Sequence, residues 1–73
     1  MTEQDFKTNF MYQLRRIMKI NHITQNELSE RSGLSEDSIT RYINGTRIPN
    51  TYIASILAGS LNCTIDDLIK PKS

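Results

Sequence analysis

The chain has 73 residues, of which 37% are hydrophobic, and a formal net charge of +1 at pH 7, so it is long enough for one small domain with a single core. Its single cysteine excludes an intramolecular disulfide, and no Cys/His cluster has the spacing of a zinc site. No apolar run is long enough for a membrane span or a signal peptide, so we expect a cytoplasmic protein that does not bind a membrane.

A stripe of apolar residues spaced three or four apart predicts a first helix from about Phe6 to Lys19. Arg15, Arg16 and Lys19 are expected to be solvated charges near its C-terminal end, where they complement the helix dipole. Asn21 can adopt the left-handed conformation and is expected to end the helix.

The second helix is predicted to begin after Thr24, because Thr24 and Glu27 have the spacing of a capping box. It is expected to run to about Ser32 and to end at Gly33.

The third helix follows after only three residues. Ser35 is a good N-cap, and Glu36 and Asp37 place negative charge in the first turn. The helix is expected to continue to Asn44, with Gly45 as its stop.

A fourth helix is predicted after Pro49-Asn50, and a short fifth helix after Thr64, where the capping pattern recurs; Pro71 closes it. No segment alternates like a strand. We therefore expect an all-α fold, a compact bundle of five short helices forming one domain over residues 1–73, with residues 70–73 as a tail or the start of a linker.

Residues 25–44 have the pattern of a helix-turn-helix unit, two short helices that cross steeply because a three-residue turn joins them. Gly33 permits the turn, and Ser29 is small where the helices approach each other. The residues expected to face inward are Leu28, Leu34, Ile39 and Tyr42. The outer face of the third helix is left with no apolar residue: Ser35, Glu36, Asp37, Thr40, Arg41 and Asn44. An exposed polar helix of this kind can enter the major groove of DNA.

Residues 24–69 resemble the DNA-binding domain of lambdoid phage repressors, Cro proteins and their Xre-like bacterial relatives. The resemblance is carried by Thr24-Gln25, Glu27-Leu28, Gly33-Leu34-Ser35, Ser38-Ile39, Tyr42-Ile43-Asn44-Gly45, Pro49, Ile56-Leu57-Ala58 and Leu61-Asn62-Cys63-Thr64-Ile65. It implies a sequence-specific transcriptional regulator, a repressor of phage, mobile-element or bacterial genes. The implied partners are double-stranded DNA with a two-fold operator and a second copy of the chain, at least on DNA.

The resemblance also implies roles for individual residues. Those expected to read bases are Glu36, Asp37, Thr40 and Arg41, and those expected to contact phosphates are Gln25, Ser35, Asn44, Thr46 and Arg47. Arg41 is the foremost candidate because arginine can bind guanine in a bidentate way; the alternative is an exposed arginine paired with Asp37. Relatives often carry glutamine where this chain has Glu36 and Asp37, so these acids either accept from cytosine or only stabilise the helix.

Three further residues carry expectations. Tyr42 replaces a smaller aliphatic residue, so its ring is expected at the edge of the core with its hydroxyl reaching solvent or phosphate. Cys63 is expected to be buried and unreactive, and His22 to be structural or exposed.

The sequence has no nucleophile–base pair, phosphate-binding glycine loop or cofactor fingerprint. We therefore expect no enzymatic activity, no cofactor, no metal and no small-molecule ligand. The two acids at the start of the third helix and the low net charge leave one alternative open, a protein-interaction module such as an antitoxin or adaptor. The sequence does not locate the dimer contact; Ile65–Ile69 and the loop at Ile48 are the two candidates.

Overall fold

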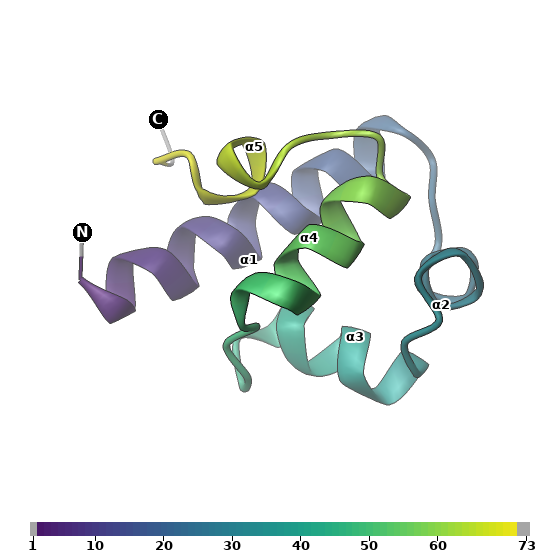
Figure 1. Ribbon diagram of the computed structural model, residues 1–73, viewed down its shortest axis with the longest axis horizontal. Helices are drawn as coiled ribbons and strands as arrows, with labels where there is room; N and C mark the ends of the chain where they lie inside the picture. The colour runs from purple at the N-terminus through teal and green to yellow at the C-terminus, as the bar shows by residue number, and fades with distance from the viewer. Residues whose placement is uncertain (1, 72–73) are drawn as a thin grey trace.

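The computed structural model describes residues 2–71, and these form five helices and no strand. The helices are α1 (Glu3–Ile20), α2 (Gln25–Ser32), α3 (Glu36–Asn44), α4 (Thr51–Ser60) and α5 (Ile65–Ile69), as shown in Figure 1. The predicted all-α fold and the order of its elements are confirmed. The predicted tail lies partly, at Lys72 and Ser73, outside the described residues.

Each helix begins at a polar side chain that accepts a hydrogen bond from a backbone amide of the first turn. The five N-caps are Thr2, Thr24, Ser35, Asn50 and Thr64, and the three threonines form complete capping boxes. These caps satisfy amides that otherwise have no partner within the helix, which explains why such short segments begin at defined residues.

The first helix departs from the sequence-based prediction at both ends. It starts at Glu3 and not at Phe6, because Thr2 and Asp5 form a capping box that the apolar pattern did not reveal. Asn21 does not adopt the left-handed conformation, which falls on His22 with a φ of 55°. Asn21 instead donates from its side chain to the Ile17 carbonyl.

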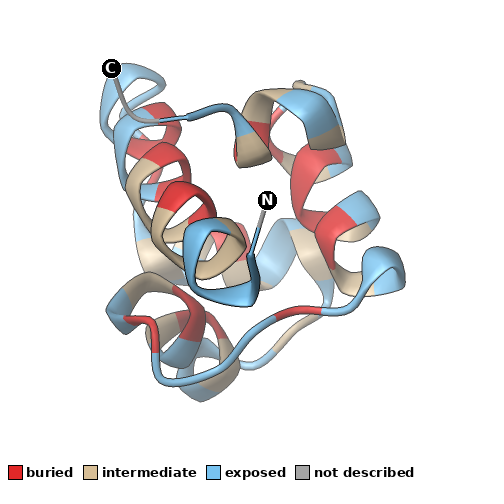
Figure 2. Ribbon diagram, turned by 90° about the vertical axis from the view of Figure 1, so that its left-hand side faces the viewer, coloured by how far each residue is buried: buried red, intermediate tan, exposed pale blue. Residues whose placement is uncertain are grey.

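The core lies between α1, α4 and the helix-turn-helix unit. Figure 2 shows buried residues on the faces that the helices turn toward one another. Six large side chains are fully buried: Phe10, Leu14, Leu28, Ile39, Leu57 and Leu68. Tyr42 belongs to this core with only 5% exposure, so it faces inward as predicted, but the prediction that its ring packs at the edge was wrong.

The turn between α2 and α3 is held by backbone conformation and by one side chain. Gly33 has a left-handed φ of 78°, and the Ser29 hydroxyl donates to the Leu34 carbonyl at 2.5 Å. In Figure 1 α2 is seen end-on while α3 runs across the view, so the two helices cross steeply. This is the helix-turn-helix arrangement predicted from the short glycine-containing turn.

The C-terminal end of α3 is fixed against α1. Gly45 is buried and left-handed, with a φ of 74°, and a β-carbon there would lie 2.8 Å from the Met11 sulfur. Arg15 of α1 donates from Nε to the Ile43 carbonyl at 3.0 Å. One end of α3 is therefore held by α1 and the other by α2, which leaves its remaining face open to solvent.

Among the described residues no helix is both long and apolar enough to cross a membrane.

Candidate nucleic-acid interface

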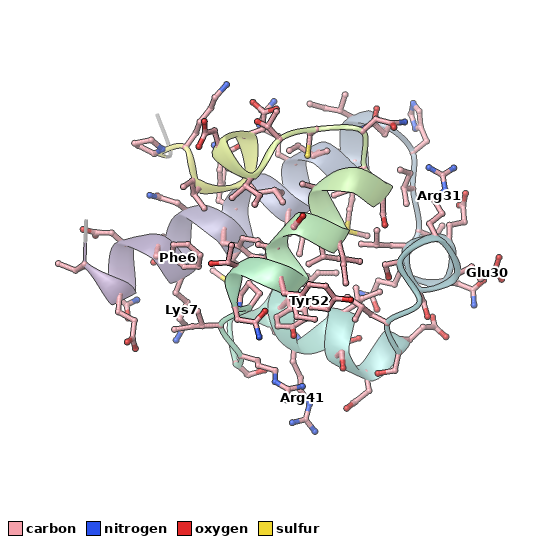
Figure 3. All side chains as sticks on the ribbon, viewed as in Figure 1. Phe6, Lys7, Glu30, Arg31, Arg41 and Tyr52 are labelled. Carbon is pink, nitrogen blue, oxygen red and sulfur yellow. The ribbon has the colours of Figure 1, made fainter. Side chains whose placement is uncertain are left out.

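The outward face of α3 is polar and exposed. Glu36, Asp37, Arg41 and Asn44 are exposed, whereas Thr40 is only half-exposed. Figure 3 shows the Arg41 side chain projecting from α3 away from the other helices. The structure thus brings together on one surface the residues that the sequence assigned to base reading.

Arg41 is paired with the acid one turn before it. Its Nε lies 3.1 Å from Oδ2 of Asp37, and the two side chains are 56% and 76% exposed. An exposed pair at this spacing contributes little to stability. The pair instead orients the Arg41 side chain, since only Nε is bonded to Asp37. Nη1 and Nη2 of Arg41 make no hydrogen bond within residues 2–71 and remain available as two adjacent donors.

The first residue of α2 is linked to α3. The Thr40 hydroxyl donates to Oε1 of Gln25 at 2.9 Å, and both residues are half-buried. Gln25 follows the N-cap Thr24, so its side chain lies at the positive end of the α2 dipole. A helix N-terminus of this kind can bind an anionic oxygen.

The flanks of α3 carry the other residues predicted to contact phosphate. At one end, the Ser35 hydroxyl accepts from the Ser38 amide and donates to the Ser38 hydroxyl. At the other end, the Thr46 hydroxyl donates to the Arg41 carbonyl at 3.3 Å. Asn44 and Arg47 are exposed, and no hydrogen bond of their side chains to residues 2–71 is found.

The groups with perturbed pKa values lie away from this surface. Hydrogen bonds from Thr64 and Lys70 lower the pKa of Asp67, which lies in α5. Burial, and then the charge of Asp67, raises the pKa of Cys63, which precedes α5 and packs against the core. Cys63 is only half-buried, and not fully buried as the sequence predicted. Residues 2–71 contain no group of three or more His, Cys, Asp or Glu residues that could hold a metal ion.

Two residues that position α3 were not identified from the sequence. Arg15 was expected to be solvated, yet it binds a carbonyl near the C-terminus of α3. Ser29 was expected to matter only for its small size, yet its hydroxyl holds the turn. The Arg15 contact depends on how α1 and α3 meet, so it has no local sequence signal, whereas the Ser29 bond spans only five residues within the turn.

Comparison with known proteins agrees with this geometry. The family model described as helix-turn-helix matches residues 14–68, which cover most of α1 and reach into α5. No curated protein matches the sequence. The matched family consists of DNA-binding regulators of the Cro/C1, Xre-like type. The chain therefore belongs to this helix-turn-helix family.

Proposed function

We propose that this chain is a sequence-specific regulator that binds double-stranded DNA with α3 in the major groove and represses phage, mobile-element or bacterial genes. The observation that carries the proposal is the exposure of Arg41 on a helix that α2 holds at its middle and α1 holds near its C-terminus. A rigid, protruding helix can present side chains to base edges without a large entropic cost on binding.

Base reading is centred on Arg41. With Nε donating to Asp37, the terminal nitrogens of Arg41 are free to donate to O6 and N7 of one guanine. Asp37 also remains a candidate to accept from a cytosine amino group, as does Glu36 in the same first turn. Thr40 shares this face, but its hydroxyl donates a hydrogen bond to Gln25.

Phosphate contacts flank α3 on both sides. Gln25 and Ser35 lie at the N-termini of α2 and α3, where helix dipoles favour an anion. At the other end of α3, its last residue Asn44 and the loop residues Thr46 and Arg47 would lie along the DNA backbone. Arg47 supplies the only full positive charge of this set, so the electrostatic part of binding is small.

Two copies of the chain are needed for useful affinity, because one copy contacts few phosphates. Of the two predicted dimer contacts, Ile65–Ile69 is the weaker candidate, since Ile65 and Ile69 pack against the core of their own chain. Ile48 is 38% exposed, and Tyr52 at the start of α4 is 71% exposed. We place the contact between copies at Ile48 and Tyr52.

The test is selection of a preferred DNA site from a random duplex library, followed by titration of that site and of its single-base variants. We expect Arg41→Ala to reduce discrimination at one base pair by about tenfold or more, the usual value of a bidentate contact. Arg47→Ala is the matched control, because it removes the same side chain from a phosphate contact.

The control should weaken binding to all sequences alike and lower the slope of log affinity against log salt by about one. No saturable binding at low salt would overturn the proposal and favour the protein-interaction module. If Arg41→Ala and Arg47→Ala reduce discrimination between base pairs equally, Arg41 does not read a base.

A further inference from the structure

One side-chain hydrogen bond joins the two helices of the helix-turn-helix unit. The Thr40 hydroxyl of α3 donates to Oε1 of Gln25 in α2, at 2.9 Å, across a sequence separation of 15 residues. Both residues are half-buried, which protects this bond from water more than the exposed Arg41–Asp37 pair.

In the structure this bond turns the oxygen of the Gln25 amide toward Thr40. A glutamine amide has an oxygen that only accepts and a nitrogen that only donates, and the two leave the same carbon in different directions. Because Thr40 holds the oxygen, the nitrogen with its two hydrogens is directed away from Thr40. The opposite orientation would present the oxygen to a phosphate, which would be repulsive.

The position of Gln25 makes that orientation useful. Gln25 is the first residue of α2, directly after the N-cap Thr24. The capping-box carboxylate of Glu27 already accepts from the Thr24 amide. An amide nitrogen of Gln25 that faces away from Thr40 can add a donor to the backbone amides at the same helix end.

We infer that Thr40 is a positioning residue that orients the Gln25 amide toward a DNA phosphate and does not itself read a base. The inference rests on the proposed DNA-binding function and deepens it. Thr40 is thereby distinguished from its neighbour Arg41, whose free terminal nitrogens face solvent. The Thr40 hydroxyl then links α3, in the major groove, to the phosphate contact that Gln25 makes from α2.

The experiment uses four variants of the full chain on the selected DNA site. Thr40→Val removes the hydroxyl and keeps the shape, Thr40→Ser keeps the hydroxyl, and Gln25→Ala removes the oriented amide. The fourth variant combines Thr40→Val with Gln25→Ala. Dissociation constants are measured for the selected site and its single-base variants at several salt concentrations, and circular dichroism establishes that each variant is folded.

We expect Thr40→Val to weaken binding about two- to tenfold, the usual effect of one neutral hydrogen bond, and equally for all sequences. The salt slope should not change, because no charge is removed. Thr40→Ser should retain wild-type affinity, and Thr40→Val should have no further effect when Gln25 is already alanine.

A second readout needs no DNA. The NMR resonances of the Gln25 side-chain amide should shift in Thr40→Val and stay close to their wild-type positions in Thr40→Ser. Unchanged resonances in Thr40→Val would show that the bond is absent and would overturn the inference.

The remaining outcomes separate the inference from the proposed function. If the wild type binds a selected site but Thr40→Val alters preference at one base pair, Thr40 reads a base and the inference is wrong. Additive losses from Thr40→Val and Gln25→Ala would also overturn it. If the wild type binds no DNA, the proposed function and the inference fail together.

Discussion

At the scale of single residues, two glycines end the helices of the helix-turn-helix unit with the same backbone conformation and different surroundings. Gly33 and Gly45 have φ values of 78° and 74°. A β-carbon at Gly33 would meet nothing within 4 Å, whereas one at Gly45 would lie 2.8 Å from the Met11 sulfur and 3.3 Å from Cε of Lys7. An alanine at Gly33 would therefore meet only backbone strain, whereas one at Gly45 would meet backbone strain and close packing.

We expect Gly33→Ala to lower the free energy of unfolding by about 1–2 kcal/mol, the usual cost of placing a side chain in the left-handed region. Gly45→Ala should cost more, because Met11 and Lys7 must also move. Denaturant unfolding of both variants beside the wild type measures the difference. If Gly45→Ala lowers the free energy of unfolding no more than Gly33→Ala, the Met11 and Lys7 side chains move aside without cost, and their close approach to Gly45 does not affect stability.

At the scale of elements, the helices are defined mainly by their first turns. Helix α5 is the extreme case, with five residues that are too few to be stable alone. Its capping box links Thr64 and Asp67 in both directions, and Lys70 forms an ion pair with Asp67 at 3.1 Å. The carbonyl of Lys70 also accepts from the buried Gln13 of α1, which ties the end of α5 to the core.

The lowered pKa of Asp67 gives the stability a defined pH dependence. The bonds from Thr64 and Lys70 favour the charged carboxylate, so the pKa in the folded state lies below the ordinary value of 3.8. This contribution is present above pH 3.8 and is lost as the pH falls through the folded-state pKa. Asp67→Asn should therefore lower the thermal unfolding midpoint at pH 7, and the difference from wild type should shrink below pH 3.8.

Asp66→Asn is the matched control, since Asp66 is the exposed neighbour of Asp67 in the same first turn. Thermal unfolding followed by circular dichroism between pH 7 and pH 2 measures both variants. If the difference in unfolding midpoint between Asp67→Asn and wild type is unchanged at pH 2, the loss of stability does not come from the charge of Asp67.

At the scale of the whole molecule, size and charge limit how it can use DNA. The net charge is +1, and α3 carries two acids and one arginine, so general attraction to the DNA backbone is weak. The molecule measures 31 × 21 × 19 Å. In the dimer proposed above, two copies centred about 34 Å apart, one turn of DNA, would meet only at their margins. For the proposed pair we therefore expect a small contact that forms only on DNA.

This geometry predicts how a variant of the proposed dimer contact should behave. The double change Ile48→Ser with Tyr52→Ser should abolish cooperative binding to DNA with two half-sites and leave affinity for a single half-site unchanged. Ile20→Ser is the control, because Ile20 is exposed to a similar degree, 59%, at the end of α1. Titration of one-site and two-site duplexes measures the effect. Cooperativity that survives the double change would place the contact elsewhere.

The sequence by itself determined the helices and their boundaries, because the signals that define them are local. Thr24 caps a residue three positions away, and Gly33 and Gly45 stop helices through their own backbone freedom. The same local signals predicted that Arg41 would face outward. The first helix was the exception, since its capping box preceded the apolar stripe used to find it.

Only the tertiary structure decided which partners the long polar side chains bind. Thr40 bonds a residue 15 positions away, Arg15 one 28 away and Gln13 one 57 away, and no local pattern encodes such partners. The depth of burial likewise depends on which helices meet: the sequence predicted that Tyr42 faces inward, but placed its ring at the edge and not in the core. The physical reason is that capping and turn energies are fixed within a few residues, whereas the partner of a long polar side chain is fixed by packing of the whole bundle.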